Sequence, residues 1–174
     1  GGVDAPTFDA GGATTQAAEA SGWDAGANTK AWVVEFETTN YVNLKLSSKQ
    51  SGENRSPQDF KIQYSLDNAT WTDVAGGTIT VAQDWTTGVV NSLSLPAACE
   101  NQASVYIRWI MTSNTGIGGN IQGNRSSFID DIYVVGELSA IPPVADFSAD
   151  QTTVCEGATV NFTDLSTESP TSWS

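Results

Sequence analysis

The sequence predicts an all-β fold, a sandwich of two antiparallel sheets. Apolar and polar residues alternate with a period of two over several short stretches, as they do in strands that bury one face. Turn-forming Gly, Asn, Ser and Asp residues separate these stretches, and helical periodicity is almost absent. Many short strands joined by such turns are typical of a two-sheet sandwich.

The strands are expected to begin only after an irregular N-terminal segment. Residues 1–29 hold six Gly and eight Ala with few large apolar anchors, which favours irregular, wrapping chain. Strands are then predicted at 30–37, 42–46, 60–64, 78–82, 89–95 and 104–112. The stretch VYIRWIM at 105–111 is apolar on both faces apart from Arg108, which indicates a central strand covered on both sides. The long polar connections at 47–59 and 113–127 are the loops where we expect ligand binding.

A domain boundary is predicted near Pro142 and Pro143. Beyond Gly136 the chain carries six acidic residues and no Lys or Arg, and a new strand-like pattern begins at Val144. We therefore expect a first domain at 1–138, a linker at 139–143 and a second unit at 144–174. The second unit has too few residues to close a sandwich of its own.

The composition excludes several classes of function. Seven Lys and Arg against 20 Asp and Glu give a net charge of -13, which disfavours nucleic acid and anionic membrane surfaces as partners. No histidine is present, so a Ser-His-Asp triad and the usual zinc or copper sites are excluded. No apolar stretch reaches the roughly 18 residues of a membrane span, so membrane insertion is not expected. Cys99 and Cys155 are either free thiols or one bridge.

Several segments resemble a known module. The segments are GWD at 22–24, SPQDFKIQYSLDNATWTDV at 56–74, QDWTTGVVNSLSLPAACENQ at 83–102, VYIRWIMTSNT at 105–115 and IDDIYVVG at 129–136. Together they resemble the jelly-roll accessory module of secreted Bacteroidetes proteins, which is galactose-binding-like and discoidin-like. The tail, with ADFSAD at 145–150 and CEGATVNFTDLS at 155–166, resembles the first part of a PKD domain, an immunoglobulin-like spacer.

The resemblance implies a function in binding and no catalysis. It predicts a carbohydrate-binding or cell-surface adhesion module that binds a polysaccharide or surface glycan. The module would lie beside other domains of the same parent chain, in a secreted or cell-surface protein. The alternative is a structural spacer or protein-assembly domain that binds no glycan. A hydrolase acting with carboxylates alone would need two of them facing one cleft, and no spacing in the sequence demands that.

Asp130 and Asp131 are the first candidates for a metal site. Neighbouring side chains of a strand point to opposite faces, so one carboxylate must lie against the covered face or its rim and needs a partner. Modules of the resembling family often hold a structural calcium between the last strand and the N-terminal segment. Asp9, Asp24 and Asp4 are then the expected further ligands. The alternative is that one Asp caps a turn and the other bonds to Arg108 or to a backbone amide.

The aromatic residues suggest a sugar-binding surface. Trp32, Trp71 and Trp109 are in phase with aliphatic strand residues and are expected in the core. The residues in polar, turn-like context are the candidates for stacking on a sugar ring: Trp23, Tyr41 and Trp85. The 47–59 connection adds candidates for hydrogen bonds to sugar hydroxyls: Lys49, Asn54 and Arg55. The alternative for that connection is a solvated loop without a ligand.

Overall fold

The structure is a computed structural model that describes residues 4–139 and 144–168. The chain divides into two compact units, Gly1–Leu138 and Ser139–Ser174. Each unit is therefore described by itself. Of the predicted linker at 139–143, all but Ser139 lies outside the described residues, as do residues 169–174 of the predicted second unit.

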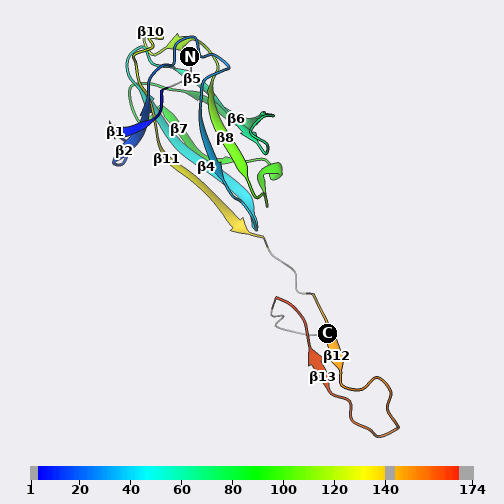
Figure 1. The fold of residues 1–174 in the computed structure, drawn as a ribbon. Helices are drawn as coiled ribbons and strands as arrows, with labels where there is room; N and C mark the ends of the chain where they lie inside the picture. Colours follow the sequence, from blue (N-terminus) through cyan, green and yellow to red (C-terminus); the bar gives the residue numbers. More distant parts are fainter. Residues whose placement is uncertain (1–3, 140–143, 169–174) are drawn as a thin grey trace. The chain divides into compact units, whose positions relative to one another are not determined.

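Unit 1 is a sandwich of two antiparallel sheets (Figure 1). The five-stranded sheet has the order β1 (Thr7–Gly11), β2 (Gln16–Ala20), β11 (Ser127–Leu138), β4 (Tyr41–Gly52) and β7 (Gly88–Ser94). The four-stranded sheet has the order β3 (Ala31–Phe36), β8 (Val105–Met111), β5 (Asp59–Ser65) and β6 (Thr72–Thr80). The remaining elements are the short strands β9 (Thr115–Gly116) and β10 (Gly119–Asn120) and the 3-10 helix η1 (Ala97–Cys99). The predicted all-β jelly-roll sandwich is thereby confirmed.

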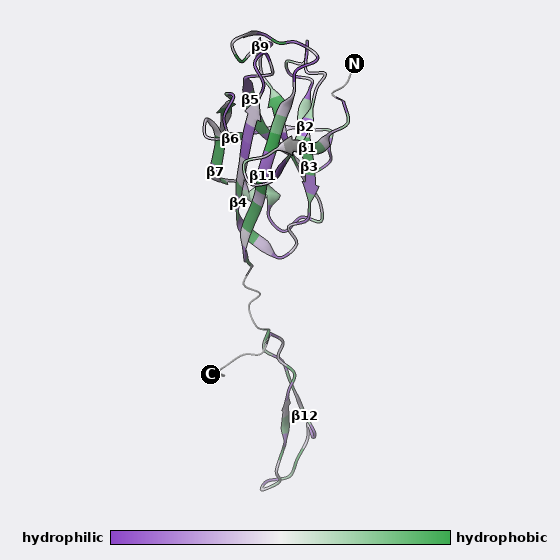
Figure 2. Cartoon of the chain, turned by 90° about the vertical axis from the view of Figure 1, so that its left-hand side faces the viewer, coloured by the Kyte–Doolittle hydropathy of each residue, from purple (hydrophilic) through white to green (hydrophobic). Residues whose placement is uncertain are grey.

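The core fills the space between the two sheets. Along the strands of unit 1, hydrophobic residues alternate with hydrophilic ones (Figure 2). Trp23, Trp109 and Phe60 are fully buried, and the Trp23 ring lies 5.3 Å from that of Trp32 and 5.9 Å from that of Phe60. Across the part of the chain that the structure describes, no helix is long and apolar enough to cross a membrane.

The N-terminal segment is more regular than its composition predicts. Strand β1 pairs with β2, and β2 pairs with β11 over Ser127–Ile129. Ala20 is almost completely buried and belongs to the core, with Ala18 packed against it. Alanine side chains are too small to produce a clear apolar alternation, so only the pairing with β11 reveals a strand here.

Strand β4 is longer than predicted. It runs to Gly52, so the first half of the expected 47–59 loop belongs to a strand. Ser48 and Gln50 point inward and are buried, and Ser48 Oγ accepts a hydrogen bond of 3.1 Å from Trp109 Nε1. Polar residues on the inner face hide the alternation that would identify a strand. The amide of Gln50 has no hydrogen-bond partner among the described residues.

Unit 2 holds one antiparallel hairpin among its described residues, formed by β12 (Phe147–Ala149) and β13 (Phe162–Asp164). The exposed rings of Phe147 and Phe162 lie 5.6 Å apart. Cys155 is exposed, whereas Cys99 is buried in unit 1, where burial raises the pKa of its thiol to about 11. Both cysteines are free thiols, so the structure contains no bridge between them.

Candidate ligand-binding site

The outer face of the five-stranded sheet carries a shallow hollow of about 380 Å³. We call it the outer-face groove. It crosses β7, β4 and β11 and is lined by Ser47, Ser48, Lys49, Val89, Val90, Asn91, Asp131 and Tyr133. Lys49 lies at its centre, opposite Asp130 on β11 and Val89 on β7. Because β4 is hydrogen-bonded on both sides, this part of the surface is held rigidly.

An ion pair lies in the groove. Lys49 Nζ is 2.9 Å from Asp131 Oδ2, and Asp131 also accepts hydrogen bonds from Thr14 Oγ1 at 2.8 Å and from the Tyr133 hydroxyl at 3.3 Å. The hydrogen bond from Lys49, with a smaller contribution from Thr14, lowers the pKa of Asp131. The same hydrogen bond raises the pKa of Lys49. Both groups are therefore charged at neutral pH.

A β-bulge places the two aspartates differently from the expectation. Asp131 has a φ of 48°, and the register with β4 shifts between Asp130 and Tyr133. Asp130 Oδ2 accepts a hydrogen bond of 3.3 Å from the backbone N–H of Thr14, the same residue whose hydroxyl binds Asp131. The prediction that neighbouring aspartates serve opposite faces is wrong here, because a bulge adds one residue and breaks the alternation.

Aromatic rings lie on both sides of Lys49 along β4. Phe128 is opposite Ser51, and Tyr133 is opposite Ser47, so Lys49 lies between the two positions. Four residues of a strand span roughly 13 Å, which is long enough for a short oligosaccharide. The side chain of Tyr133 is exposed, at 57%.

Trp85 joins this surface from the turn before β7. Its half-buried ring lies 6.3 Å from the ring of Phe128. Asp84 shapes the turn by accepting hydrogen bonds from the backbone N–H groups of Thr86 at 2.8 Å and Thr87 at 2.6 Å, which lower the pKa of Asp84 to about 2. The carbonyl of Ala82 accepts a hydrogen bond of 3.2 Å from the N–H of Gly52 and thereby ties the turn to the end of β4.

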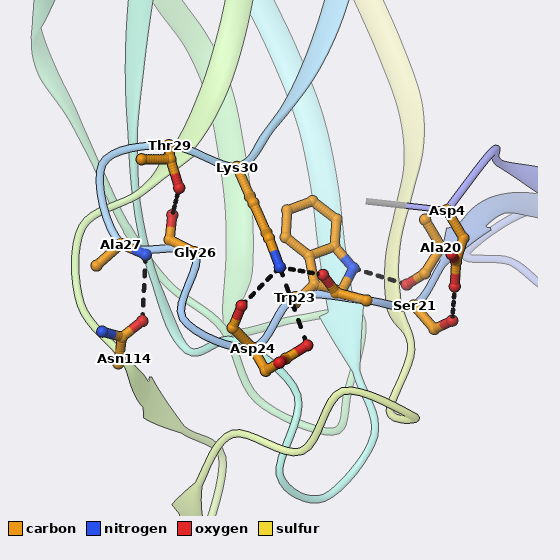
Figure 3. Close-up of polar contacts among 11 residues, drawn as sticks. Asp4, Ala20, Ser21, Trp23, Asp24, Gly26, Ala27, Thr29, Lys30 and Asn114 are labelled. Atoms are coloured by element: carbon orange, nitrogen blue, oxygen red, sulfur yellow. Dashed lines mark hydrogen bonds and ion pairs between the residues drawn. The ribbon is translucent and has the colours of Figure 1, made fainter. Parts of the chain in front are cut away.

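Two of the predicted ligand-binding residues lie on or beside the five-stranded sheet. Lys49 lines the outer-face groove, and Trp85 lies in the turn before β7. Trp23 does neither, and its prediction is wrong: its side chain is 0% exposed, and its Nε1 donates a hydrogen bond of 2.7 Å to the carbonyl of Ala20 (Figure 3). Polar neighbours such as Ser21 and Asp24 suggested that Trp23 is an exposed loop residue. Its side chain is instead buried and holds the loop against the core. Tyr41 is exposed but lines a different hollow, between β3 and β11.

Asn54 and Arg55 lie in the turn beyond the end of β4. The N–H of Arg55 donates to the carbonyl of Ile117 at 2.7 Å, and the carbonyl of Arg55 accepts from the N–H of Gln122 at 3.0 Å. These bonds fix Arg55 with a positive φ of 70° against the segment that holds β9 and β10. Neither Asn54 nor Arg55 lines the outer-face groove.

The aspartates expected for calcium do not form one site in the part of the chain that the structure describes, where no three His, Cys, Asp or Glu side chains gather closely enough to hold a metal. The side chain of Asp9 lies outside that part. Calcium binding stays a prediction, and a lower melting temperature after chelation would support it. Asp130 and Asp131 instead take part in hydrogen bonds and an ion pair, as in the alternative, but with Lys49 in place of Arg108.

Asp24 belongs to a loop that a lysine closes. Lys30 Nζ donates to the carbonyl of Gly22 at 2.5 Å and to that of Asp24 at 2.6 Å, and it lies 3.9 Å from Asp24 Oδ1 (Figure 3). Asp4 accepts a hydrogen bond of 2.5 Å from Ser21 Oγ in the same region. The ammonium group of Lys30 is thus surrounded by the carbonyl oxygens of Gly22 and Asp24 and a carboxylate oxygen of Asp24.

Arg108 has other partners than an aspartate of β11. Its guanidinium lies 4.1 Å from the centre of the Trp71 ring, and its Nε donates a hydrogen bond of 2.8 Å to Gln63 Oε1. Trp71 is only half-buried in this stack, so its predicted place in the core is wrong. Trp71 directly precedes β6, and a residue beside a strand can follow its apolar phase and still cover a cation at the surface.

Sequence reasoning did not identify Phe128 and Tyr133 as ligand-binding candidates. Both belong to β11, Phe128 directly before the IDDIYVVG segment and Tyr133 within it, and the apolar residues of this segment suggest core. The bulge at Asp131 turns Tyr133 outward, and no residue pattern marks a bulge reliably. The adjacent charged pair was the available signal that this strand departs from simple alternation.

A family of known domains matches more than half of this chain. The profile of the F5/8 type C domain family matches residues 4–122. A solved structure titled "CBM4 structure and function" is similar with a TM-score of 0.49 and 15% identity, over 76% of this chain and 78% of that chain. No curated protein matches the chain significantly. Because the family profile spans well over half of its residues, the chain belongs to the F5/8 type C domain family.

Proposed function

We propose that this module binds a polysaccharide or surface glycan in the outer-face groove and catalyses no reaction. The observation that carries the proposal is the Lys49–Asp131 pair, which lies on rigid strands beside the exposed ring of Tyr133. Membership of a family of binding modules supports it.

The chemistry of the groove matches that of a sugar. A pyranose ring offers hydroxyl groups that donate and accept, together with an apolar face of C–H groups. Lys49 supplies donors, the Asp131 carboxylate supplies acceptors, and the amide of Asn91 supplies both. The face of Tyr133 supplies an apolar plane within the groove, and Trp85, which does not line the groove, supplies a second one beside Phe128. Strands hold these groups in place before the ligand arrives, which reduces the entropic cost of binding.

Affinity gel electrophoresis through a panel of neutral and acidic polysaccharides tests the proposal. At least one polysaccharide should retard the wild-type protein, and Tyr133→Ala should weaken that binding about 30-fold, since aromatic hot spots contribute about 2 kcal/mol. The melting temperature should stay nearly constant because Tyr133 is exposed. Tyr41→Ala is the matched control, being the same substitution on the same sheet outside the groove.

Two results would contradict glycan binding in this groove. One is that no polysaccharide retards the wild-type protein, in which case the spacer or protein-assembly function becomes the better proposal. The other is that Tyr41→Ala weakens binding as much as Tyr133→Ala does. Either result leaves the family assignment intact.

We also propose that the module works within a larger secreted or cell-surface protein. The motifs of the tail, which resemble the start of a PKD domain, support this context. The exposed rings of Phe147 and Phe162 support it too, because an exposed apolar pair on a two-stranded hairpin is suited to packing against further structure. Fractionation of the cells that produce the protein, with immunodetection in the medium and at the surface, tests the location.

A further inference from the structure

Unit 1 has a second and larger hollow, of about 570 Å³, between β3 and the C-terminal half of β11. We call it the edge cleft. Its lining includes Glu35, Phe36, Glu37, Tyr41, Ile132 and Val134. None of these residues lines the outer-face groove, so the two hollows are separate.

One wall of the edge cleft is the free edge of β3. Within the described residues, β3 pairs only with β8. The N–H of Met111 donates to the carbonyl of Lys30 at 3.0 Å, and the register pairs Trp32 with Trp109. Hydrogen-bonded and non-bonded pairs alternate along an antiparallel ladder. Every second residue, including Val33 and Glu35, therefore directs its backbone N–H and C=O away from β8, toward the open edge.

The other wall is a stretch of β11 that has a partner strand on one side alone among the described residues. Strand β2 pairs with β11 only over Ser127–Ile129, so from Asp130 to Leu138 β11 pairs with β4 alone among the described strands. Gly136 lets β11 approach β4 closely there, since a Cβ would lie 2.7 Å from Leu44 Cδ2. The cleft thus lies between two strand edges, one from each sheet, where the sandwich is not closed.

The side chains give the cleft an apolar interior and an acidic rim. Phe36, Ile132 and Val134 pack against the core. Glu35 and Glu37 are exposed on the β3 side. Glu35 Oε1 accepts a hydrogen bond of 2.5 Å from Ser104 Oγ, and this bond and one with Tyr106 lower the pKa of Glu35. Glu35 therefore remains an anion at neutral pH.

We propose that the edge cleft docks an extended segment of a partner polypeptide in which apolar residues alternate with Lys or Arg. The segment would add to β3 as a further strand, with its main chain bonded to the free groups of Val33 and Glu35. Its apolar side chains would enter the cleft, and its cationic ones would lie beside Glu35 and Glu37.

Charge decides between this occupant and a second copy of the chain. Antiparallel pairing of two β3 edges would bring the carboxylates of two copies onto the same face, and like charges facing each other across strands are destabilising. The net charge of -13 acts against self-association as well. A cationic partner meets neither obstacle, and acidic residues along an open edge are a common protection against self-pairing.

Fluorescence anisotropy with a capped, labelled seven-residue peptide of alternating Lys and Val tests the proposal on the full chain. We expect saturable binding, together with slower hydrogen exchange at the amides of Val33 and Glu35. A peptide with N-methyl groups on alternate residues, and one with Glu in place of Lys, should bind at least about tenfold more weakly, the equivalent of one lost hydrogen bond or more. Equal binding of the methylated peptide would overturn strand addition.

Two variants locate the site. Val33→Pro removes one donor from the free edge while leaving the β8 ladder intact, and it should weaken binding about tenfold, whereas Val33→Ala should not. The pair Glu35→Gln and Glu37→Gln should also weaken binding. Glu156→Gln with Glu168→Gln changes the charge equally in unit 2 and serves as the control. Unchanged melting temperatures show that the variants are folded.

The experiments on peptide binding and those on glycan binding can fail independently of each other. Tyr133→Ala should leave peptide binding unchanged, and a loss in that variant would overturn the assignment to the edge cleft. Sedimentation should show a monomer. A wild-type dimer that Val33→Pro converts to monomer would identify a second copy as the occupant and would overturn the proposal.

Discussion

Lys49 and Asp131 lie on neighbouring strands of the five-stranded sheet with their charged atoms 2.9 Å apart. Their backbones come from β4 and from a bulge of β11, segments far apart in the sequence. Thr14, in the β1–β2 connection, donates to the same carboxylate. One carboxylate thus links the N-terminal hairpin, β4 and the last strand, and it is the central group of the proposed glycan site.

The stability contributed by the Lys49–Asp131 pair should depend on pH. The folded-state pKa of Asp131 lies below its unfolded value, so the contribution is present above the ordinary Asp pKa of about 3.9 and is lost as the pH falls through the folded value. A double-mutant cycle of Lys49→Met and Asp131→Asn, measured by urea unfolding, should give a small favourable coupling at pH 7. The coupling should shrink toward zero as the pH falls through the folded-state pKa of Asp131. A coupling that is constant with pH would contradict the role assigned to this pair.

Trp23 and Trp85 should respond differently to truncation. Trp23→Ala should lower the free energy of unfolding by roughly 3 to 5 kcal/mol, because it empties a fully buried position between Trp32 and Phe60. Trp85→Ala should cost less stability and should weaken glycan binding. Urea unfolding and affinity gels measure the two effects. If Trp23→Ala were as stable as the wild type, its assigned place in the core would be wrong.

The ammonium group of Lys30 should stabilise the loop that it closes. Lys30→Met should lower the free energy of unfolding by roughly 1 to 3 kcal/mol, because the carbonyls of Gly22 and Asp24 lose their shared donor. Lys45→Met removes an exposed lysine of β4 and should be nearly neutral. Equal effects of the two substitutions in thermal and urea unfolding would contradict the bridging role of Lys30.

Two neighbouring glycines should differ in their tolerance of a methyl group. A Cβ at Gly12 would overlap Asp130 Oδ2 and would lie 2.8 Å from the backbone carbonyl carbon of Gln16, whereas one at Gly11 would meet nothing within 4 Å. Gly12→Ala should therefore cost roughly 1 to 3 kcal/mol, as overpacking does, and Gly11→Ala should be close to neutral. Thermal unfolding of both variants decides the matter. A neutral Gly12→Ala would show that β11 does not pack tightly on this turn.

The sequence by itself determined the class of the fold and most of its strands. The alternation at β3 and β5 identifies strands because one face of each is buried, and that condition leaves a period of two in the residues. The continuous apolar run of β8 identifies a central strand. The charge of -13 and the absence of histidine were sufficient to exclude whole classes of partner and catalyst. The family resemblance added the jelly-roll connectivity.

Only the tertiary structure decided which residues share a surface. Trp23 lies in the core and Tyr41 in the edge cleft, although both have polar sequence neighbours, because burial depends on what packs against a side chain from elsewhere in the chain. The bulge at Asp131 likewise depends on the pairing of β11 with β4. The alternation of residues along the sequence shows only the period of a strand. Its partner strand and their register depend on contacts between residues distant in sequence. These contacts bring Lys49, Asp131 and Tyr133 together.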